Sequence, residues 1–156
     1  MRGKQAPTRE LLLDPRFKSL PIAKFTNYLM RRGKKTSAQK IVYDCFAMIS
    51  DKTKQDALEI FDRAIRNVSP SLEVRGRRIG GANYQIPFPV RTERKFALAS
   101  RWLIEAAKKR KGRSMAEKLA MEIMEASQNQ GEAFKKKEDV HKMAEANRAF
   151  AHFARY

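Results

Sequence analysis

The sequence predicts a mainly α-helical single domain of about six helices, with a β-hairpin protruding between the third and fourth helices. Apolar residues recur with the roughly 3.6-residue period of a helix through most of the chain. Between residues 72 and 90 the period changes to two on either side of Gly80-Gly81, which is typical of a hairpin. At 156 residues the chain is long enough to bury one core.

Three helices are predicted before the hairpin, each an apolar run between a polar N-cap and a helix breaker. They follow a polar, basic arm at residues 1–18, and the helical domain spans 19–156, with the hairpin at about 72–90. Cys45 falls in the apolar stripe of the second helix and is interpreted as core packing. The expected boundary residues are Ser19 and Gly33 for the first helix, Thr36 or Ser37 for the start of the second, and Asp56 and Pro70 for the third.

Three more helices are predicted after the hairpin. The fourth begins at Thr92 and ends in the cationic run Lys108–Lys111 before Gly112, which suits the helix dipole and a glycine C-cap. The fifth opens with the capping-box spacing of Ser114 and Glu117. The sixth begins near Ala133, and its expected packing side carries Val140, Met143, Ala144 and Asn147.

The register of the hairpin is predicted from its apolar face. A plain two-residue turn at Gly80-Gly81 would pair Arg75 with Ile86 and mix charged and apolar residues on one face. We therefore expect a three-residue loop from Gly80 to Ala82, which pairs Val74 with Phe88, Gly76 with Ile86, and Arg78 with Tyr84. This register keeps the apolar face intact towards the base of the hairpin.

Two prolines in the second strand predict that the hairpin is paired on one side only. Pro87 and Pro89 have no N–H group, and residues two apart direct their backbone to the same side of a strand. Both must therefore face a free edge. A two-stranded ribbon of this kind is marginally stable unless another element supports it.

The charge of the chain points to a polyanionic partner. There are 34 Lys and Arg residues against 17 Asp and Glu, giving a formal net charge of +17. Nucleic acid is the most common partner of such a protein, followed by an anionic membrane surface. Basic clusters spread over a rigid body favour a structured polyanion over a flat bilayer. A hydrophobic fraction of 42% argues against a disordered basic tail.

The hairpin carries the most specific basic cluster. Arg75, Arg77 and Arg78 crowd a strand that ends in two glycines, and arginine supplies bidentate phosphate contacts. Tyr84 is a candidate stacking platform for a base. The alternative is a surface excursion without a ligand. Each of the other basic clusters, taken alone, is more often a solvated face than a binding site. These clusters are Arg31-Arg32 with Lys34-Lys35, Arg91 with Arg94 and Lys95, Lys108–Lys111, and Lys135–Lys137.

The sequence contains no assembled catalytic site, and we expect no enzyme activity, metal or cofactor. His141 and Glu145 are four residues apart, a spacing that is usually surface pairing. His141 and His152 are separated by about 16 Å along a helix, too far to share a metal. No secretory signal or membrane span is recognised, so we expect a cytoplasmic protein with no membrane partner.

Several long motifs resemble the bacterial-type small-subunit ribosomal protein seven family. The similarity covers nearly the whole chain. The motifs that carry it are Gly33-Lys34-Lys35 followed by Ile41-Val42 and Cys45, the stretch 77–87 (RRIGGANYQIP), Val90-Arg91, Leu98-Ala99, Arg101-Trp102, and the stretch 138–147 (EDVHKMAEAN).

The resemblance implies a protein of the small ribosomal subunit that binds the 3′ domain of its RNA and nucleates assembly of the head. It also implies that the hairpin lies near the exit-site tRNA, with mRNA and neighbouring ribosomal proteins as further partners. Gly80, Gly81 and Tyr84 are the candidates near tRNA. The candidate RNA contacts are Arg2, Lys4, Lys34, Lys35, Arg75, Arg77, Arg78, Arg91, Arg94, Lys95, Arg101, Lys135, Lys136 and Lys142.

The main alternative is an architectural DNA-binding protein whose basic β-arm enters the minor groove. In this sequence the prolines stand at the base of the ribbon, whereas a wedging residue would stand at its tip. A basic enzyme is a more distant alternative, because no titratable pair in a pocket is recognisable.

Overall fold

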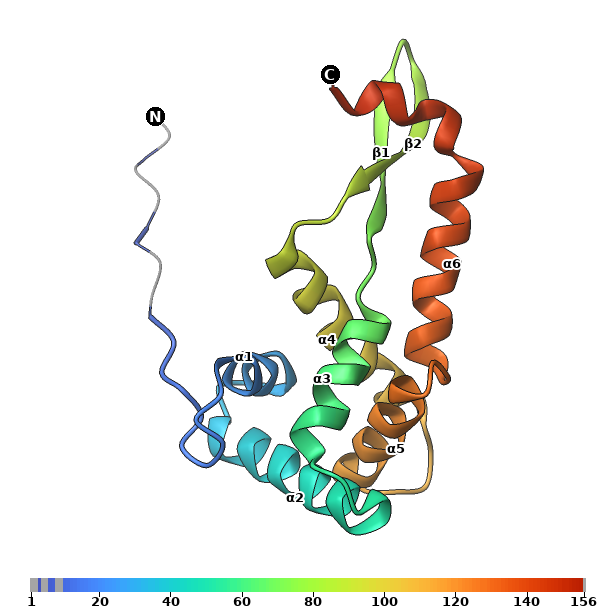
Figure 1. Ribbon diagram of the computed structural model, residues 1–156. Coiled ribbons are helices and arrows are strands. Elements are labelled where there is room, and N and C mark those ends of the chain that lie inside the picture. The colour runs from blue at the N-terminus through green and yellow to red at the C-terminus, as the bar shows by residue number, and fades with distance from the viewer. Residues whose placement is uncertain (1–2, 4–5, 8–9, 156) are drawn as a thin grey trace.

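The computed structural model describes residues 3, 6–7 and 10–155 (Figure 1). In these residues a bundle of helices carries an upright β-hairpin, so the predicted mainly α architecture, with its hairpin between the third and fourth helices, is confirmed. The elements are α1 (Leu20–Leu29), α2 (Lys35–Thr53), α3 (Ala57–Val68), β1 (Leu72–Ile79), β2 (Ala82–Pro89), α4 (Thr92–Lys109), α5 (Met115–Ser127), α6 (Glu132–Ala146) and the 3₁₀ helix η1 (Arg148–Arg155).

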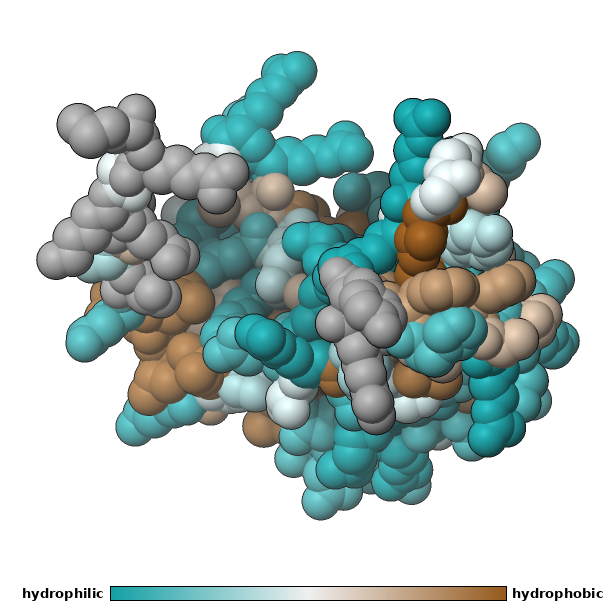
Figure 2. Space-filling model, turned by 90° about the horizontal axis from the view of Figure 1, so that it is seen from above, coloured by the Kyte–Doolittle hydropathy of each residue, from teal (hydrophilic) through white to brown (hydrophobic). Residues whose placement is uncertain are grey.

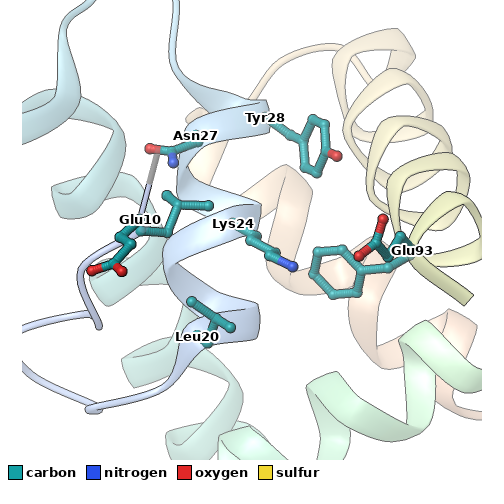
Figure 3. Close-up of a pocket in the computed structure, with 8 residues that line it drawn as sticks. Glu10, Leu20, Lys24, Asn27, Tyr28 and Glu93 are labelled. Atoms are coloured by element: carbon teal, nitrogen blue, oxygen red, sulfur yellow. The ribbon is translucent and has the colours of Figure 1, made fainter. Parts of the chain in front are cut away.

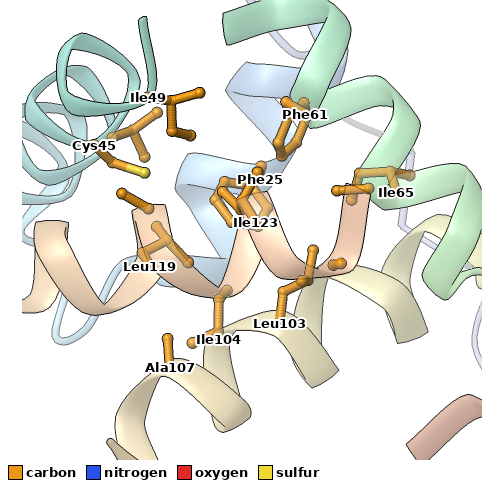
Figure 4. Packing of buried hydrophobic residues seen from close by; sticks show 14 of the residues in the cluster. Phe25, Cys45, Ile49, Phe61, Ile65, Leu103, Ile104, Ala107, Leu119 and Ile123 are labelled. Atoms are coloured by element: carbon orange, nitrogen blue, oxygen red, sulfur yellow. The ribbon is translucent and has the colours of Figure 1, made fainter. Parts of the chain in front are cut away.

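The hydrophobic core lies among α1 to α5 (Figure 4). Three phenylalanines meet in it, with ring centroids 5.1 Å apart for Phe25 and Phe61 and 5.5 Å apart for Phe46 and Phe61. Cys45 is fully buried beside them, which confirms its interpretation as core packing. Burial raises the pKa of the Cys45 thiol, because a thiolate is poorly solvated there.

The predicted N-caps of α3 and α5 are confirmed. The Asp56 side chain accepts a hydrogen bond from the Leu58 N–H at 3.0 Å. Ser114 accepts from the Glu117 N–H at 3.3 Å, and its hydroxyl donates to the Glu117 carboxylate at 2.9 Å, so both residues of the predicted pair take part in the cap. Each helix therefore begins where its sequence satisfies the free N–H groups of the first turn.

The predicted boundary between the first two helices is wrong. α1 ends at Leu29 and α2 begins at Lys35, ahead of both expected caps. The reason is a tight turn in which Arg32 and Gly33 adopt positive φ angles of 52° and 73°. Gly33 thus shapes this turn and does not end a helix.

The packing side expected for α6 is also partly wrong. Ala144 is buried as expected, but Met143 is 51% exposed. α6 stands beside the hairpin, away from the centre of the core (Figure 1), so its buried side chains are few and small: Ala133 and Ala144. α6 therefore does not need a strongly apolar stripe to pack in this position.

The predicted three-residue hairpin loop is wrong. The strands are joined by a two-residue turn at Gly80-Gly81, and Ile79 pairs with Ala82. Both glycines have positive φ angles, 57° and 90°, as a type I′ turn requires. In place of the expected pairs, the register sets Glu73 opposite Phe88, Arg75 opposite Ile86, and Arg77 opposite Tyr84. The preference of two glycines for a tight turn outweighs the separation of charged and apolar faces, because interactions across the face compensate the charges.

The one-sided pairing predicted from the two prolines is confirmed. β1 and β2 form a two-stranded antiparallel sheet. The Val90 N–H donates to the Ser71 carbonyl at 3.0 Å, so that pair is hydrogen bonded. Since bonded and non-bonded pairs alternate along an antiparallel ladder, Pro89 and Pro87 fall at non-bonded positions. Neither proline removes a bond from the sheet.

The hairpin is supported by the C-terminal elements. α6 lies alongside it and η1 crosses it near the tip (Figure 1). The Tyr84 ring lies 5.1 Å from the Phe150 ring and 5.7 Å from the Phe153 ring, measured between centroids. At the base, the Ser71 N–H donates to His141 Nε2 at 3.1 Å. These contacts stabilise a two-stranded ribbon that would be only marginally stable on its own.

Substituting both Phe150 and Phe153 with Ala is expected to loosen the hairpin without unfolding the helices. Each aromatic pair contributes about 0.5–1.5 kcal/mol, and η1 lies outside the main core. Hydrogen exchange should show faster exchange of the β2 amides with unchanged helicity by circular dichroism. Unchanged β2 protection would contradict a supporting role for η1.

His141 makes the support of the hairpin pH dependent. Burial lowers the pKa of His141 below its usual value of 6.5, and the charge of Lys137 lowers it further. The neutral ring accepts the Ser71 N–H, so this stabilisation is present above pH 6.5 and is lost as the pH falls through the lowered pKa. An NMR titration should give a His141 midpoint below 6.5. A midpoint at or above that value would contradict the contact.

No helix among the described residues is long and apolar enough to cross a membrane.

Candidate nucleic-acid interface

A basic cavity of 620 Å³ lies at the base of the hairpin, where β1, β2 and the start of α4 meet. Three arginines line it against a single glutamate, so the charge of its wall is positive. A cavity of this sign suits an anionic ligand. The lining residues are Glu73, Arg75, Phe88, Pro89, Val90, Arg91 and Arg94.

Glu73 links two of these arginines. Arg75 Nε donates to Glu73 Oε1 at 2.7 Å, and Arg94 Nε donates to Glu73 Oε2 at 3.1 Å. Burial by itself raises the pKa of this carboxyl, but the hydrogen bonds from Arg75 and Arg94 outweigh it and hold the pKa below its usual range. Glu73 is therefore an anion that joins β1 to α4.

The Phe88 ring packs against two arginines of β1. The guanidinium carbons of Arg75 and Arg77 lie 5.5 Å and 5.6 Å from its centroid, within the range of a cation–π interaction. The mixed face that argued against the two-residue turn is therefore stabilised by arginine–aromatic contacts and by Glu73.

The hairpin presents its arginines on two faces. Arg77 pairs with Tyr84, and Arg78, one residue on, pairs with Asn83 and so lies on the opposite face. Both arginines are exposed. Gly80 and Gly81 form the exposed tip, whereas Tyr84 is half-buried under η1. Tyr84 is thus less open to a stacking base than the sequence suggested.

The candidates on the helical body lie in separate places. Lys34 lines a 300 Å³ cavity with Arg31 and Lys108, which brings the loop before α2 next to the end of α4. Arg101 extends over the Tyr28 ring, 5.6 Å from its centroid. The remaining exposed or half-buried candidates outside these cavities are Lys35, Lys95 and Lys142.

Some basic clusters have internal partners. Lys135 and Lys136 line a cavity together with the carboxylates of Glu105, Glu132 and Asp139, so their charge is locally compensated. Neighbouring Lys137 donates to the Asn67 carbonyl at 2.7 Å. Two further candidates, Arg2 and Lys4, lie outside the described residues.

A cavity larger than the arginine-lined one has a different character (Figure 3). It measures 760 Å³ and lies between α1 and the start of α4, with Leu20, Tyr28 and Phe96 in its wall. Its charged residues are the two carboxylates of Glu10 and Glu93 and the ammonium of Lys24. An apolar space with an excess of carboxylates does not suit a phosphate backbone.

The face seen from above is mostly hydrophilic (Figure 2). Hydrophobic side chains gather on it in two places, one of them in the N-terminal segment. Leu11, Leu12 and Leu13 are exposed in that segment. Among the described residues, no group of three or more His, Cys, Asp or Glu side chains is placed to hold a metal ion.

Glu73 and Phe88 are site residues that the sequence did not predict. The sequence did contain a signal for Glu73, because Glu73 and Arg75 are two residues apart in a strand and so share a face. The predicted register paired Phe88 with Val74, on the face opposite Glu73. The sequence therefore did not indicate that Phe88 and Glu73 belong to one site. The expected surface pair of His141 with Glu145 is also wrong, since His141 accepts the Ser71 N–H.

Comparison with known proteins identifies the family of the chain. The model of the family "Ribosomal protein S7p/S5e" matches residues 1–148. Relatives named "Small ribosomal subunit protein uS7" include those of Acidithiobacillus ferrooxidans, 53% identical over 97% of both chains, and Mesomycoplasma hyopneumoniae, 57% identical over 97% of both chains. The relative of that name from Thermotoga maritima is 56% identical over 98% of this chain and 99% of its own. The chain therefore belongs to the ribosomal protein S7p/S5e family.

Proposed function

We propose that this protein is a structural, non-enzymatic constituent of the small ribosomal subunit, working in the cytoplasm. It binds the 3′ domain of the small-subunit RNA, nucleates assembly of the head, and sets the tip of its hairpin near the exit-site tRNA. Its relatives carry the name of a small-subunit ribosomal protein. Neighbouring ribosomal proteins and mRNA are its further partners.

The observation that carries the proposal is the arginine cavity at the base of the hairpin. Arg75 from β1 and Arg91 and Arg94 from the start of α4 line one space. Planar guanidiniums around a space of this kind suit the phosphates of a folded RNA. The exposed Arg77 and Arg78 extend the basic surface towards the tip.

Salt dependence of binding tests the proposal. With a transcript of the 3′ domain, the logarithm of the affinity should fall against the logarithm of the salt concentration with a slope of about 0.7–0.9 per phosphate neutralised. Because several basic residues take part, we expect a total slope of several units. A slope near one or less would show that the clusters are merely solvated.

Competition with duplex DNA separates the main alternative. The protein should remain on the ribosomal RNA when duplex DNA is added at equal nucleotide concentration, because it recognises folded strands and A-form geometry. Displacement by the DNA would favour an architectural DNA-binding role. Co-sedimentation with small subunits in high salt is the corresponding test with the assembled particle.

A further inference from the structure

We propose that Glu73 is a positioning residue for RNA binding, which holds the guanidiniums of Arg75 and Arg94 towards a phosphodiester segment in the cavity at the hairpin base. The inference rests on the proposed function and deepens it. An acidic residue would then favour the binding of a polyanion, an effect that the net charge of the chain alone would not suggest.

The exposures of the three side chains support this role. The Glu73 side chain is 12% exposed, whereas those of Arg75 and Arg94 are 58% and 46% exposed. The carboxylate is thus covered while the guanidiniums reach solvent. Arg94 is held through Nε, which leaves its two terminal nitrogens for a ligand.

Positioning matters because a free arginine loses much of its rotamer freedom when it binds. Glu73 fixes two arginines from different elements before the RNA arrives, and Phe88 braces one of them. It also separates charges that would otherwise repel within one cavity. An RNA segment therefore meets donors that are already oriented.

Two physical effects predict opposite results for Glu73→Gln. The substitution adds one unit of positive charge, which by itself would tighten binding to any polyanion. It also removes the anion that orients Arg75 and Arg94. We expect the second effect to win, because the carboxylate is covered and is compensated at contact distance by the two guanidiniums.

The experiment measures the affinity of full-length variants for the 3′-domain transcript at several salt concentrations. E73Q should bind at least about fivefold more weakly than the unchanged protein. Its salt slope should fall by the equivalent of one or two phosphates, at about 0.7–0.9 each. E73D keeps the carboxylate and should bind more tightly than E73Q, despite its lower net charge.

The matched control is Asp62→Asn, which makes the same charge change at an exposed carboxylate on α3. It should bind as tightly as the unchanged protein or slightly more tightly. Hydrogen exchange of the Val90 amide, which donates to the Ser71 carbonyl, reports the integrity of the hairpin base. This amide should stay protected in E73Q.

Two results would overturn the inference. Binding of E73Q as tight as that of D62N would show that the carboxylate orients nothing the RNA needs. Weaker binding of E73Q together with faster exchange of the Val90 amide would make Glu73 a structural residue. Failure of the proposed function is distinguishable from both, because the unchanged protein and D62N would then also lack salt-dependent binding to the transcript.

Discussion

Replacing Arg110 with Ala is expected to lower the free energy of unfolding by about 3–5 kcal/mol, the usual effect of removing one partner from a buried ion pair. Arg110 follows the last residue of α4, and its Nε donates to Glu122 Oε2 at 2.9 Å. Glu122 is fully buried in α5. The substitution would leave this carboxylate in the interior without its cation.

The position of Glu122 explains why the effect should be large. Its second oxygen, Oε1, accepts the N–H of Ala133 at 2.9 Å, in the first turn of α6. Arg110 also donates from Nη1 to Glu125 at 3.0 Å. The hydrogen bond to Glu125 raises the pKa of Arg110, and the bond to Glu122 adds to this, against the opposing effect of burial. One guanidinium therefore connects the end of α4, the middle of α5 and the start of α6.

Chemical denaturation followed by circular dichroism would measure the decrease in stability. The matched control is Arg113→Ala in the same loop, where the side chain is exposed and donates to the Met121 sulfur. This control should change stability by no more than about 0.5 kcal/mol. A decrease below about 1 kcal/mol for R110A would show that Glu122 finds another partner or water.

Much of the fold follows from local sequence signals. Asp56 and Ser114 mark helix starts because a cap needs only a side-chain oxygen next to free N–H groups. Pro87 and Pro89 predict a free strand edge because they lack a donor. These features depend on a few neighbouring residues, and so the sequence contains them.

What could not be predicted depends on contacts between distant segments. By its sequence Arg110 belongs to a solvated basic run, yet it pairs with residues 12 and 15 positions away. The predicted hairpin register is wrong because the weight given to a clean apolar face ignored Glu73 and Phe88 as partners for arginine. The aromatic support of Tyr84 comes from η1, which had no counterpart in the prediction. Counting charges does not distinguish cations that hold the fold from cations that are free for RNA.

Replacing Arg77 and Arg78 together with Ala is expected to weaken binding to the 3′-domain transcript by about 1–3 kcal/mol for each arginine that makes a bidentate contact. The salt slope should fall by roughly one for each phosphate that the variant no longer binds. Helicity should be unchanged, because both side chains are exposed on the hairpin. A decrease in helicity would show instead that the hairpin is needed for folding.

The single variants R77A and R78A would show which face of the hairpin contacts RNA. Arg77 and Arg78 lie on opposite faces, because they pair with Tyr84 and Asn83 in turn. If the ribbon enters a groove, both single variants weaken binding. If it lies flat on the RNA, one variant weakens binding and the other leaves it unchanged. Since η1 covers the Tyr84 ring on the Arg77 face, a ribbon that lies flat on the RNA near its tip would use the face of Arg78 there. R78A should then reproduce nearly the whole effect of the double variant.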